Sequence, residues 1–148
     1  MTSPTEPSAT VRIERTYGAP AQAVFDAWTS VEVMQRWWHA GPDWETPSAE
    51  VDLRVGGRVR VVMRSPDGAE HGGGGEYTEI APPARLAFTW AWDDEPGRRT
   101  LVELGFTEAD GATTVVLTHS GLAGEESRQG HEGGWHDVLD NLGHVVEA

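Results

Sequence analysis

Two histidines near the C-terminal end of the chain have the side-chain chemistry best suited to acid–base work. His119 lies in the alternating segment ATTVVLTHSG and shares a predicted strand face with Val115 and Leu117. Because imidazole titrates near neutral pH, His119 could orient a ligand or move a proton inside a cavity. The alternative is a structural histidine whose ring nitrogens are hydrogen-bonded within the core.

His131 is the second candidate, because it precedes Trp135 by one helical turn and falls on nearly the same face of the predicted C-terminal helix. The alternative is an exposed histidine at the start of that helix. The stretch HEGGWH suggests zinc, but a zincin motif places two histidines four residues apart on one helical face. His131 and His136 are five apart, roughly 100° out of alignment, so we predict neither a metal site nor another cofactor.

Three further motifs offer weaker chemistry. Ser120 follows His119 directly, so alternation points the two side chains to opposite strand faces and argues against a serine hydrolase. The run GGGGEY (72–77) lacks the Gly-Lys-Ser/Thr of a phosphate-binding loop, and we predict a flexible hairpin tip there. Three arginines aligned on one strand predict a solvated outer face, with an inward arginine that binds a ligand carboxylate as the alternative. They are Arg58, Arg60 and Arg64.

Large aromatic side chains gather in the stretch QRWWHAGPDW (35–44), which holds Trp37, Trp38 and Trp44. Indole rings bury much surface, so such a cluster either fills a core or lines a cavity. We expect Trp44 to lie at a strand edge without a special role.

The bulk composition narrows the class of protein. With 148 residues, 38% of them apolar and 24% charged, the chain is predicted to be globular. The net charge of −13 argues against nucleic acid and anionic membranes as partners, and no apolar run predicts a membrane span. With no cysteine and no export signal, the chain is expected in the cytoplasm. A disordered polar tail (1–10) is expected to precede one domain (11–147).

The elements that position these residues follow from periodicity. TVRIERTYGAP alternates apolar and polar residues and predicts a first strand, after which Pro20 marks the start of a helix. Thr29 and Glu32 have the spacing of a capping box, which predicts a second short helix that ends through Gly41 and Pro42. Segments of period two then predict about six more strands joined by short turns such as SPDG.

Helical periodicity returns in the last segment, GEESRQGHEGGWHDVLDNLGHVVEA. Three glycines, Gly130, Gly133 and Gly134, weaken the first half of this helix by up to ~1 kcal/mol each relative to alanine. We interpret them as a place of close backbone approach or a local bend. A curved antiparallel sheet that grips one long helix leaves a wedge in which a ligand can lie. The apolar face of the helix contains Trp135, Val138, Leu139, Leu142, Val145 and Val146.

Several stretches, taken in order, resemble one known family. They are TYGAPAQAVFDAWTSVEVMQRWW, VDLRVGGRVRVVMRSPDG, GEYTEIAPPARLAFTW, VELGFTEADGATTVVLTHSGL and GHEGGWHDVLDNLGHVV. From about Val11 to Val146 the chain is similar to the activator-of-Hsp90-ATPase-homologue-like (AHSA1-like) branch of the SRPBCC superfamily, which is START/Bet v 1-like. The resemblance implies an α+β helix-grip fold: a curved antiparallel sheet of six to seven strands on a long C-terminal helix, with two short helices after the first strand.

The same resemblance implies a cavity between the sheet and the last helix, with the indoles as its wall and rim. It implies binding of a small hydrophobic ligand, aromatic or polycyclic, by a carrier or by a sequestering stress protein. Relatives of this fold in antibiotic-producing bacteria act as self-resistance proteins that take up a toxic metabolite. The expected ligand-binding residues are Trp28, Trp37, Trp38, Met63, Tyr77, Phe88, Trp90, Trp92, His119, His131, Trp135 and Leu139.

Two other functions stay open from the sequence. One is an enzyme, a cyclase, dehydratase or hydrolase acting on a polyketide-like substrate, with His119 or His131 as the acid or base. The other is a co-factor of an Hsp90-type chaperone, as the family name suggests, although the sequence shows no second module or extended interaction segment. The residues favour a binding protein over an enzyme without deciding between them.

Overall fold

The computed structural model describes residues 9–41 and 43–147. Residues 1–8 of the predicted tail, and Pro42 at the predicted end of the second helix, lie outside the described residues. The elements in chain order are β1 (Ala9–Tyr17), α1 (Ala21–Thr29), α2 (Val31–Trp37), β2 (Glu45–Val51), β3 (Arg58–Arg64), β4 (Glu70–Ala81), β5 (Arg85–Trp92), β6 (Thr100–Ala109), β7 (Ala112–Leu122) and α3 (Glu125–Val146).

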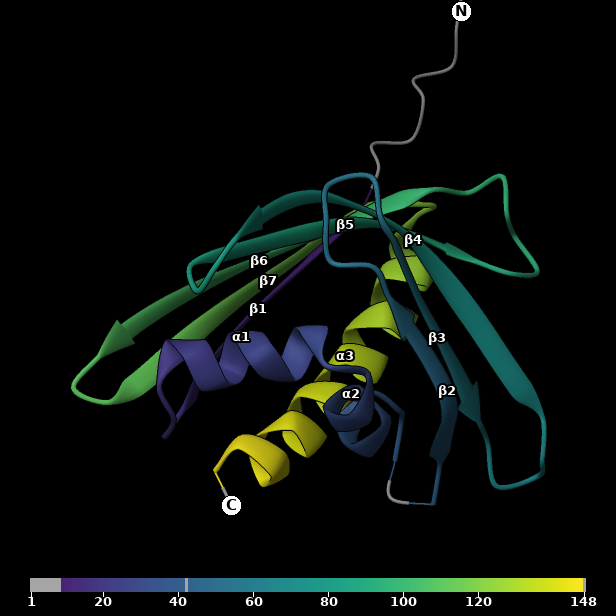
Figure 1. Ribbon diagram of the computed structural model, residues 1–148. Helices are drawn as coiled ribbons and strands as arrows, with labels where there is room; N and C mark the ends of the chain where they lie inside the picture. The colour runs from purple at the N-terminus through teal and green to yellow at the C-terminus, as the bar shows by residue number, and fades with distance from the viewer. Residues whose placement is uncertain (1–8, 42, 148) are drawn as a thin grey trace, which may run out of the picture.

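One curved antiparallel sheet organises the molecule. Its strand order is β1-β7-β6-β5-β4-β3-β2. Apart from the β1–β7 pair, each pair of hydrogen-bonded strands is also consecutive in sequence. Figure 1 shows the sheet bending over α3, with β2 and β3 turned down along one side, α1 beneath the other strands, and α2 beside β2 and α3. This arrangement confirms the predicted α+β helix-grip fold.

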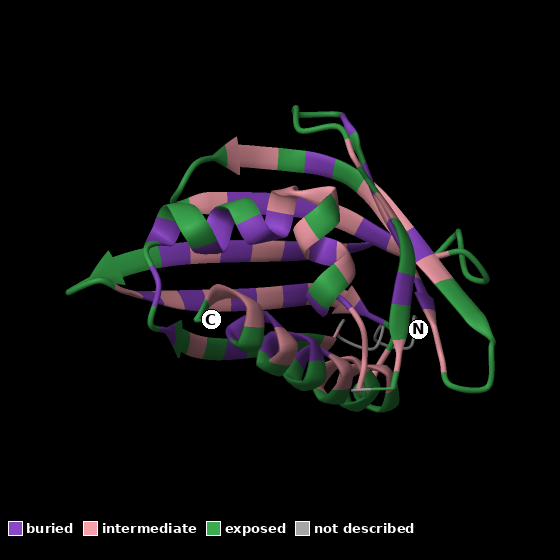
Figure 2. Cartoon of the chain, turned by 60° about the horizontal axis from the view of Figure 1, so that its bottom comes forward, coloured by how far each residue is buried: buried purple, intermediate pink, exposed green. Residues whose placement is uncertain are grey.

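The core lies between the concave face of the sheet and the three helices. Alternation along β5 points Leu86, Phe88 and Trp90 inward, and each is at most 4% exposed. Figure 2 shows the same banding on the other strands, and buried positions on the faces that the helices turn to the sheet. Each fully buried large side chain of this kind contributes about 1.5–3 kcal/mol to folding.

The boundary between the two short helices differs from the prediction. α1 runs through Thr29, whose hydroxyl donates to the carbonyl oxygen of Phe25 (3.2 Å). α2 begins at Val31 after Ser30, and no side chain caps it. The capping-box interpretation is therefore wrong, because the Thr29 hydroxyl bonds back to the preceding turn instead of starting a new one.

The glycine run 72–75 lies inside β4, so the expectation of a hairpin tip is wrong. The tip is the neighbouring SPDG turn, which closes with Gly68 at φ +89°. A Cβ atom placed on Gly73 would lie 2.5 Å from Cζ2 of Trp90. The sheet thus needs a residue without a side chain at this position, because the Trp90 indole occupies the space that a side chain would fill.

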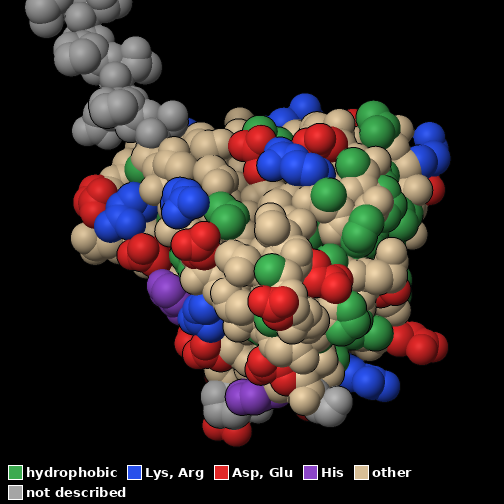
Figure 3. Space-filling model, turned by 90° about the vertical axis from the view of Figure 1, so that its left-hand side faces the viewer, with side chains coloured by type: hydrophobic (Ala, Val, Ile, Leu, Met, Phe, Trp, Pro, Cys, Tyr) green, Lys and Arg blue, Asp and Glu red, His purple; other side chains and the backbone are tan. Residues whose placement is uncertain are grey.

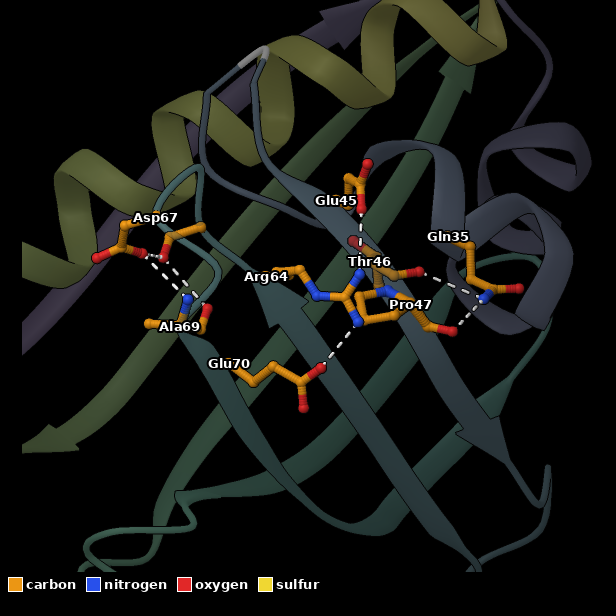
Figure 4. A network of polar contacts seen from close by, with 9 residues as sticks. Gln35, Glu45, Thr46, Pro47, Arg64, Asp67, Ala69 and Glu70 are labelled. Atoms are coloured by element: carbon orange, nitrogen blue, oxygen red, sulfur yellow. Dashed lines mark hydrogen bonds and ion pairs between the residues drawn. The ribbon is translucent and has the colours of Figure 1, made fainter.

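Charged side chains of both signs are interspersed on the surface, as one face shows in Figure 3. Two of the predicted outer-face arginines of β3 form ion pairs on this surface. Arg60 pairs with Asp93 (2.7 Å), and Arg64 lies between Glu45 and Glu70 (Figure 4). No helix within residues 9–41 and 43–147 is long and apolar enough to cross a membrane. Arginines with an ion-pair partner are Arg15, Arg54, Arg60, Arg64, Arg85 and Arg128.

Candidate functional site

A cavity of about 590 Å³ lies between the sheet and the N-terminal half of α3. Strands β3 to β5 form one wall, α3 forms the facing wall, and the segment between α2 and β2 closes one side. Ligand pockets in proteins typically enclose about 300–1,000 Å³, so this space has the size of a small-molecule site. The indole side chains that line it are Trp38, Trp44, Trp90, Trp92 and Trp135.

Four of these indoles pack against one another. The rings of Trp38 and Trp90 are stacked, with centroids 5.8 Å apart and an angle of 18° between their planes. Trp90 meets Trp92 edge to face at 5.3 Å, and Trp38 lies 5.8 Å from Trp135. The four rings come from the segment after α2, from β5 and from α3, so the indole wall joins all three parts of the cavity.

Hydrogen bonds fix the backbone that carries Trp38. The hydroxyl of Thr46 on β2 donates to the Trp38 carbonyl oxygen (2.8 Å), and the side-chain amide of Asn141 on α3 donates to the carbonyl oxygen of His39 (2.8 Å). Gln35 on α2 donates to the carbonyl oxygens of Thr46 and Pro47 (Figure 4). The end of α2 is therefore tied to both the sheet and the long helix.

His119 on β7 is fully buried and lies in the cavity wall beside Trp135. The indole N–H of Trp135 donates to its Nδ1 (3.0 Å), and Nε2 lies 2.7 Å from the hydroxyl of Thr100. An indole nitrogen only donates, so Nδ1 is an acceptor and the proton sits on Nε2, which donates to Thr100. The Thr100 hydroxyl in turn donates to the Trp90 carbonyl oxygen (3.0 Å), so every member of the chain is satisfied.

His131 makes the second histidine–tryptophan pair. The indole N–H of Trp92 donates to Nε2 of His131 (3.1 Å). The proton of His131 must then sit on Nδ1, which donates to the carbonyl oxygen of Ser127 one helical turn earlier (2.8 Å). Both ring nitrogens are occupied, as they are in His119.

The electrostatic setting keeps His119 uncharged. Burial, and secondarily the neighbouring His131 ring at 5.0 Å, lower the pKa of His119 to about 3. A neutral ring with both nitrogens hydrogen-bonded has no lone pair or proton free for a substrate. The structure therefore gives His119 the hydrogen-bonding pattern of the structural alternative.

Glycines form the part of the α3 wall that faces the indoles. Gly130 and Gly134 lie one turn apart and both line the cavity. A Cβ atom on either one would meet no other atom within 4 Å, apart from its chain neighbours and the helix backbone. The expected close backbone approach is therefore wrong, and α3 runs without interruption from Glu125 to Val146. What the glycines leave is open space in front of the indole wall.

The mouth of the cavity contains residues that the sequence did not single out. Trp44, expected to have no role, lines the mouth with its ring 5.5 Å from that of His71 on β4. Trp44 directly precedes β2, an edge strand of the sheet, as expected, and the absence of a special role stays a prediction. The acidic residues at the mouth are Glu70, Asp93, Asp94 and Glu95. In the sequence, the clustered carboxylates and the helical glycines were the available signals of this part of the site. Only the tertiary structure shows that they line the same cavity.

The predicted ligand-binding residues divide into two groups. Those on the cavity wall are Trp38, Met63, Trp90, Trp92, His119, His131 and Trp135. Those packed in the core away from it are Trp28, Trp37, Tyr77, Phe88 and Leu139. In the core group, burial raises the pKa of the Tyr77 hydroxyl. Neither this hydroxyl nor the Trp28 indole N–H has a hydrogen-bond partner among the described residues.

The two histidines of HEGGWH diverge. His131 faces Trp92 in the cavity wall, whereas Nδ1 of His136 lies 2.9 Å from a guanidinium nitrogen of Arg15 on β1. The five-residue spacing thus sends the two rings to different surroundings. Within residues 9–41 and 43–147, no group of three or more potential ligand side chains is placed to hold a metal ion.

Comparison with known proteins gives a consistent picture. The family described as activator of Hsp90 ATPase homolog 1-like protein matches residues 18–147. An AHSA1-like protein from Aeromonas hydrophila is similar in structure with a TM-score of 0.79 and 32% identity, over 94% of this chain and 92% of that one. No curated protein matches the sequence.

Two further structures extend the comparison. The AHSA1 protein from Silicibacter pomeroyi has a TM-score of 0.79 and 30% identity, over 92% of this chain and 96% of that one. A protein from Chromobacterium violaceum has a TM-score of 0.83 at 22% identity, over 95% of this chain and 99% of that one. At that identity, the last comparison shows the fold alone.

Proposed function

The chain belongs to the activator of Hsp90 ATPase homolog 1-like family, and from this premise we propose that it binds a small hydrophobic ligand with an aromatic or polycyclic body in the cavity beside α3. Proteins with this fold commonly bind hydrophobic ligands. The ligand would lie between the indole wall and the glycine face of the helix. A protein that binds such a ligand without converting it would act as a carrier or as a sequestering protein. Its cytoplasmic location stays a prediction.

The observation that carries this proposal is the pair Gly130 and Gly134. Each glycine in a helix interior costs about 1 kcal/mol relative to alanine. Neither position is crowded, since an added Cβ would meet nothing within 4 Å. Packing therefore does not require glycine there, and the missing side chains leave space open in front of the indoles.

The histidine geometry favours binding over catalysis. A general acid or base must reach the proton it transfers with a free nitrogen or a free N–H. In His119 and His131 both ring nitrogens already have partners within the protein. Their role in the proposed site is to hold the N–H edges of Trp92 and Trp135, so that these indoles leave mainly carbon surface for the ligand.

The Hsp90-related role in the family description is less favoured by the surface. A chaperone partner would need an exposed docking area, and such areas contain contiguous apolar side chains. Among the described residues, the exposed large hydrophobic side chains are Leu53 and Val55 on the turn between β2 and β3. Two neighbouring side chains form a much smaller patch than a stable interface needs.

Binding is tested with N-phenyl-1-naphthylamine, a neutral aromatic probe whose fluorescence rises in apolar surroundings. We expect saturable binding with a Kd on the order of 10 µM for a probe of this size. Energy transfer from tryptophan to the bound probe should accompany it, because five indoles line the cavity. An absence of saturable binding would overturn the proposal.

Two variants of α3 supply a matched pair for this measurement. Gly134→Leu places a side chain in the cavity, whereas Gly133→Leu places the same side chain on the exposed face one residue earlier. Both replace a helical glycine and should raise helix stability similarly, by about 0.8 kcal/mol. We expect Gly134→Leu to weaken probe binding at least ~10-fold and Gly133→Leu to change it less than ~2-fold. Equal effects would place the probe elsewhere on the protein.

A further inference from the structure

The surface that the cavity offers to a ligand is mostly aromatic carbon. The N–H groups of Trp92 and Trp135 are directed at histidine nitrogens, and Trp38 and Trp90 are stacked on each other in the same wall. The accessible indole surface is mainly that of Trp44 and Trp92, which are half-buried, whereas Trp38, Trp90 and Trp135 are at most 7% exposed. Of the aromatic side chains, indole attracts a cation over its ring face most strongly.

The charges around the cavity have one sign. Four carboxylates line its mouth, and the described lining residues include no arginine, while the chain has no lysine. Glu70 and Asp93 are paired with Arg64 and Arg60, whose guanidinium groups lie outside the lining. Asp94 and Glu95, in the turn after β5, form no ion pair within 4 Å among the described residues. The mouth therefore keeps an excess of negative charge.

The histidines of the cavity do not balance this charge. His119 in the cavity wall is held neutral, because burial lowers its pKa to about 3. His131 already uses both ring nitrogens within the protein. An anionic ligand would find no free hydrogen-bond donor on these two rings.

We propose that the ligand is a cation, with an apolar aromatic body against the indole wall and a protonated amine or quaternary ammonium group toward Asp94 and Glu95. This inference rests on the proposed binding function and adds the chemical class of its ligand. The carboxylates alone would not define a site. They support one because they line the same cavity as the indoles, and both carboxylates and indole faces attract cations. The net charge of −13 would also raise the local concentration of cations and lower that of anions.

Three naphthalene compounds of similar size separate charge from shape: 2-naphthylmethylammonium, 2-naphthylmethanol and 2-naphthoate. Their affinities are measured at pH 7.5 by displacement of N-phenyl-1-naphthylamine. We expect the ammonium compound to bind roughly 10-fold more tightly than the alcohol, and the carboxylate to bind most weakly. The advantage of the ammonium compound should shrink at 1 M salt, where charges are screened within about 3 Å.

Charge-neutral variants locate the effect. In the double variant Asp94→Asn/Glu95→Gln, affinity for the ammonium compound should fall about 3- to 10-fold, while affinity for the alcohol changes less than ~2-fold. The control is Glu14→Gln/Asp137→Asn, which removes two exposed carboxylates that do not line the cavity. It alters the net charge equally and should leave the preference intact.

The outcomes distinguish the two proposals. If the alcohol binds as tightly as the ammonium compound, the ligand is not selected for positive charge and the inference is overturned, although hydrophobic binding stands. If the control variant removes the preference as fully as the Asp94→Asn/Glu95→Gln variant does, the assignment to the mouth is wrong. If neither the neutral probe nor any of the three compounds binds, the proposed function itself fails.

Discussion

The two halves of α3 face the same sheet but do different things. The C-terminal half fills its side of the wedge with Leu139 and Leu142, each at most 1% exposed. The N-terminal half presents Gly130 and Gly134 to an open cavity. Tryptophans occur against both halves, so aromatic residues alone do not indicate a binding site. What distinguishes the open half is the missing side chains opposite the aromatic wall.

The glycines of the two halves of α3 have different surroundings. In the filled half, a Cβ on Gly143 would lie 3.3 Å from Cε1 of Tyr17, whose hydroxyl donates to the carbonyl oxygen of Leu139 (2.9 Å). That glycine lets β1 pack closely on the helix. In the open half, Gly130 and Gly134 have no such neighbour. The following variants test this contrast, from the largest expected effect to the smallest.

Removal of a core side chain from the filled half should have the largest effect on stability. Leu142 is fully buried, so Leu142→Ala should lower the free energy of unfolding by about 2–5 kcal/mol through lost burial and the cavity left behind. Urea denaturation measures the loss, and probe binding to the folded variant should be unchanged. A loss below ~1 kcal/mol would show that this half is not tightly packed.

His119→Phe probes the hydrogen-bonded support of the open half. The variant leaves the Trp135 indole N–H without an acceptor and should cost about 1–3 kcal/mol at pH 7. Burial lowers the pKa of His119 in the folded protein to about 3, below its ordinary value. The unfolded chain therefore binds more protons than the folded protein below about pH 6.5, and acid weakens the wild type by up to about 1.4 kcal/mol per pH unit through this residue.

The variant lacks that acid penalty, so the stability difference between the two proteins should shrink by about 2 kcal/mol between pH 6.5 and pH 5. Urea denaturation at several pH values measures it. Because both proteins share the same carboxylates, the difference isolates the histidine. A difference that stays constant with pH would mean that His119 is not held neutral.

Alanine at the two kinds of glycine should give opposite results. Gly134→Ala should raise the free energy of unfolding by up to about 1 kcal/mol, since it improves helix propensity without a clash. Gly143→Ala should give no gain or a loss, because its Cβ would press on the Tyr17 ring. Thermal unfolding compares them directly. A stabilising Gly143→Ala variant would remove the contrast between the halves.

The smallest effect is expected on the outer face of the sheet. Arg64 bridges Glu45 and Glu70 but is exposed to solvent (Figure 4). Arg64→Gln should therefore change stability by less than about 1 kcal/mol, and by less still in high salt. Urea denaturation at two salt concentrations measures it. A larger loss of unfolding free energy would mean that these exposed ion pairs contribute substantially to the stability of the sheet.

Local sequence patterns were enough to predict most of the fold. The alternation of Leu86, Phe88 and Trp90 identified an inward strand face, and SPDG identified the turn between β3 and β4, because both signals depend on neighbours in sequence. The contacts that decide the site are not local. The acceptors for the Trp92 and Trp135 N–H groups come from different elements, and the space before Gly134 depends on what stands across the wedge. For the same reason Trp44 gave no signal of its place at the mouth.

The most direct test of the contrast between the halves is a two-dimensional NMR titration that follows the seven indole N–H signals as N-phenyl-1-naphthylamine is added. The indoles of the cavity, from Trp38 to Trp135, should shift and saturate together. Trp37 should keep its signal, because its N–H donates to the carbonyl oxygen of Ala27 inside the filled end (3.0 Å). Equal shifts of Trp37 and Trp135, or no shift of any indole, would contradict the assignment of an open, ligand-binding half.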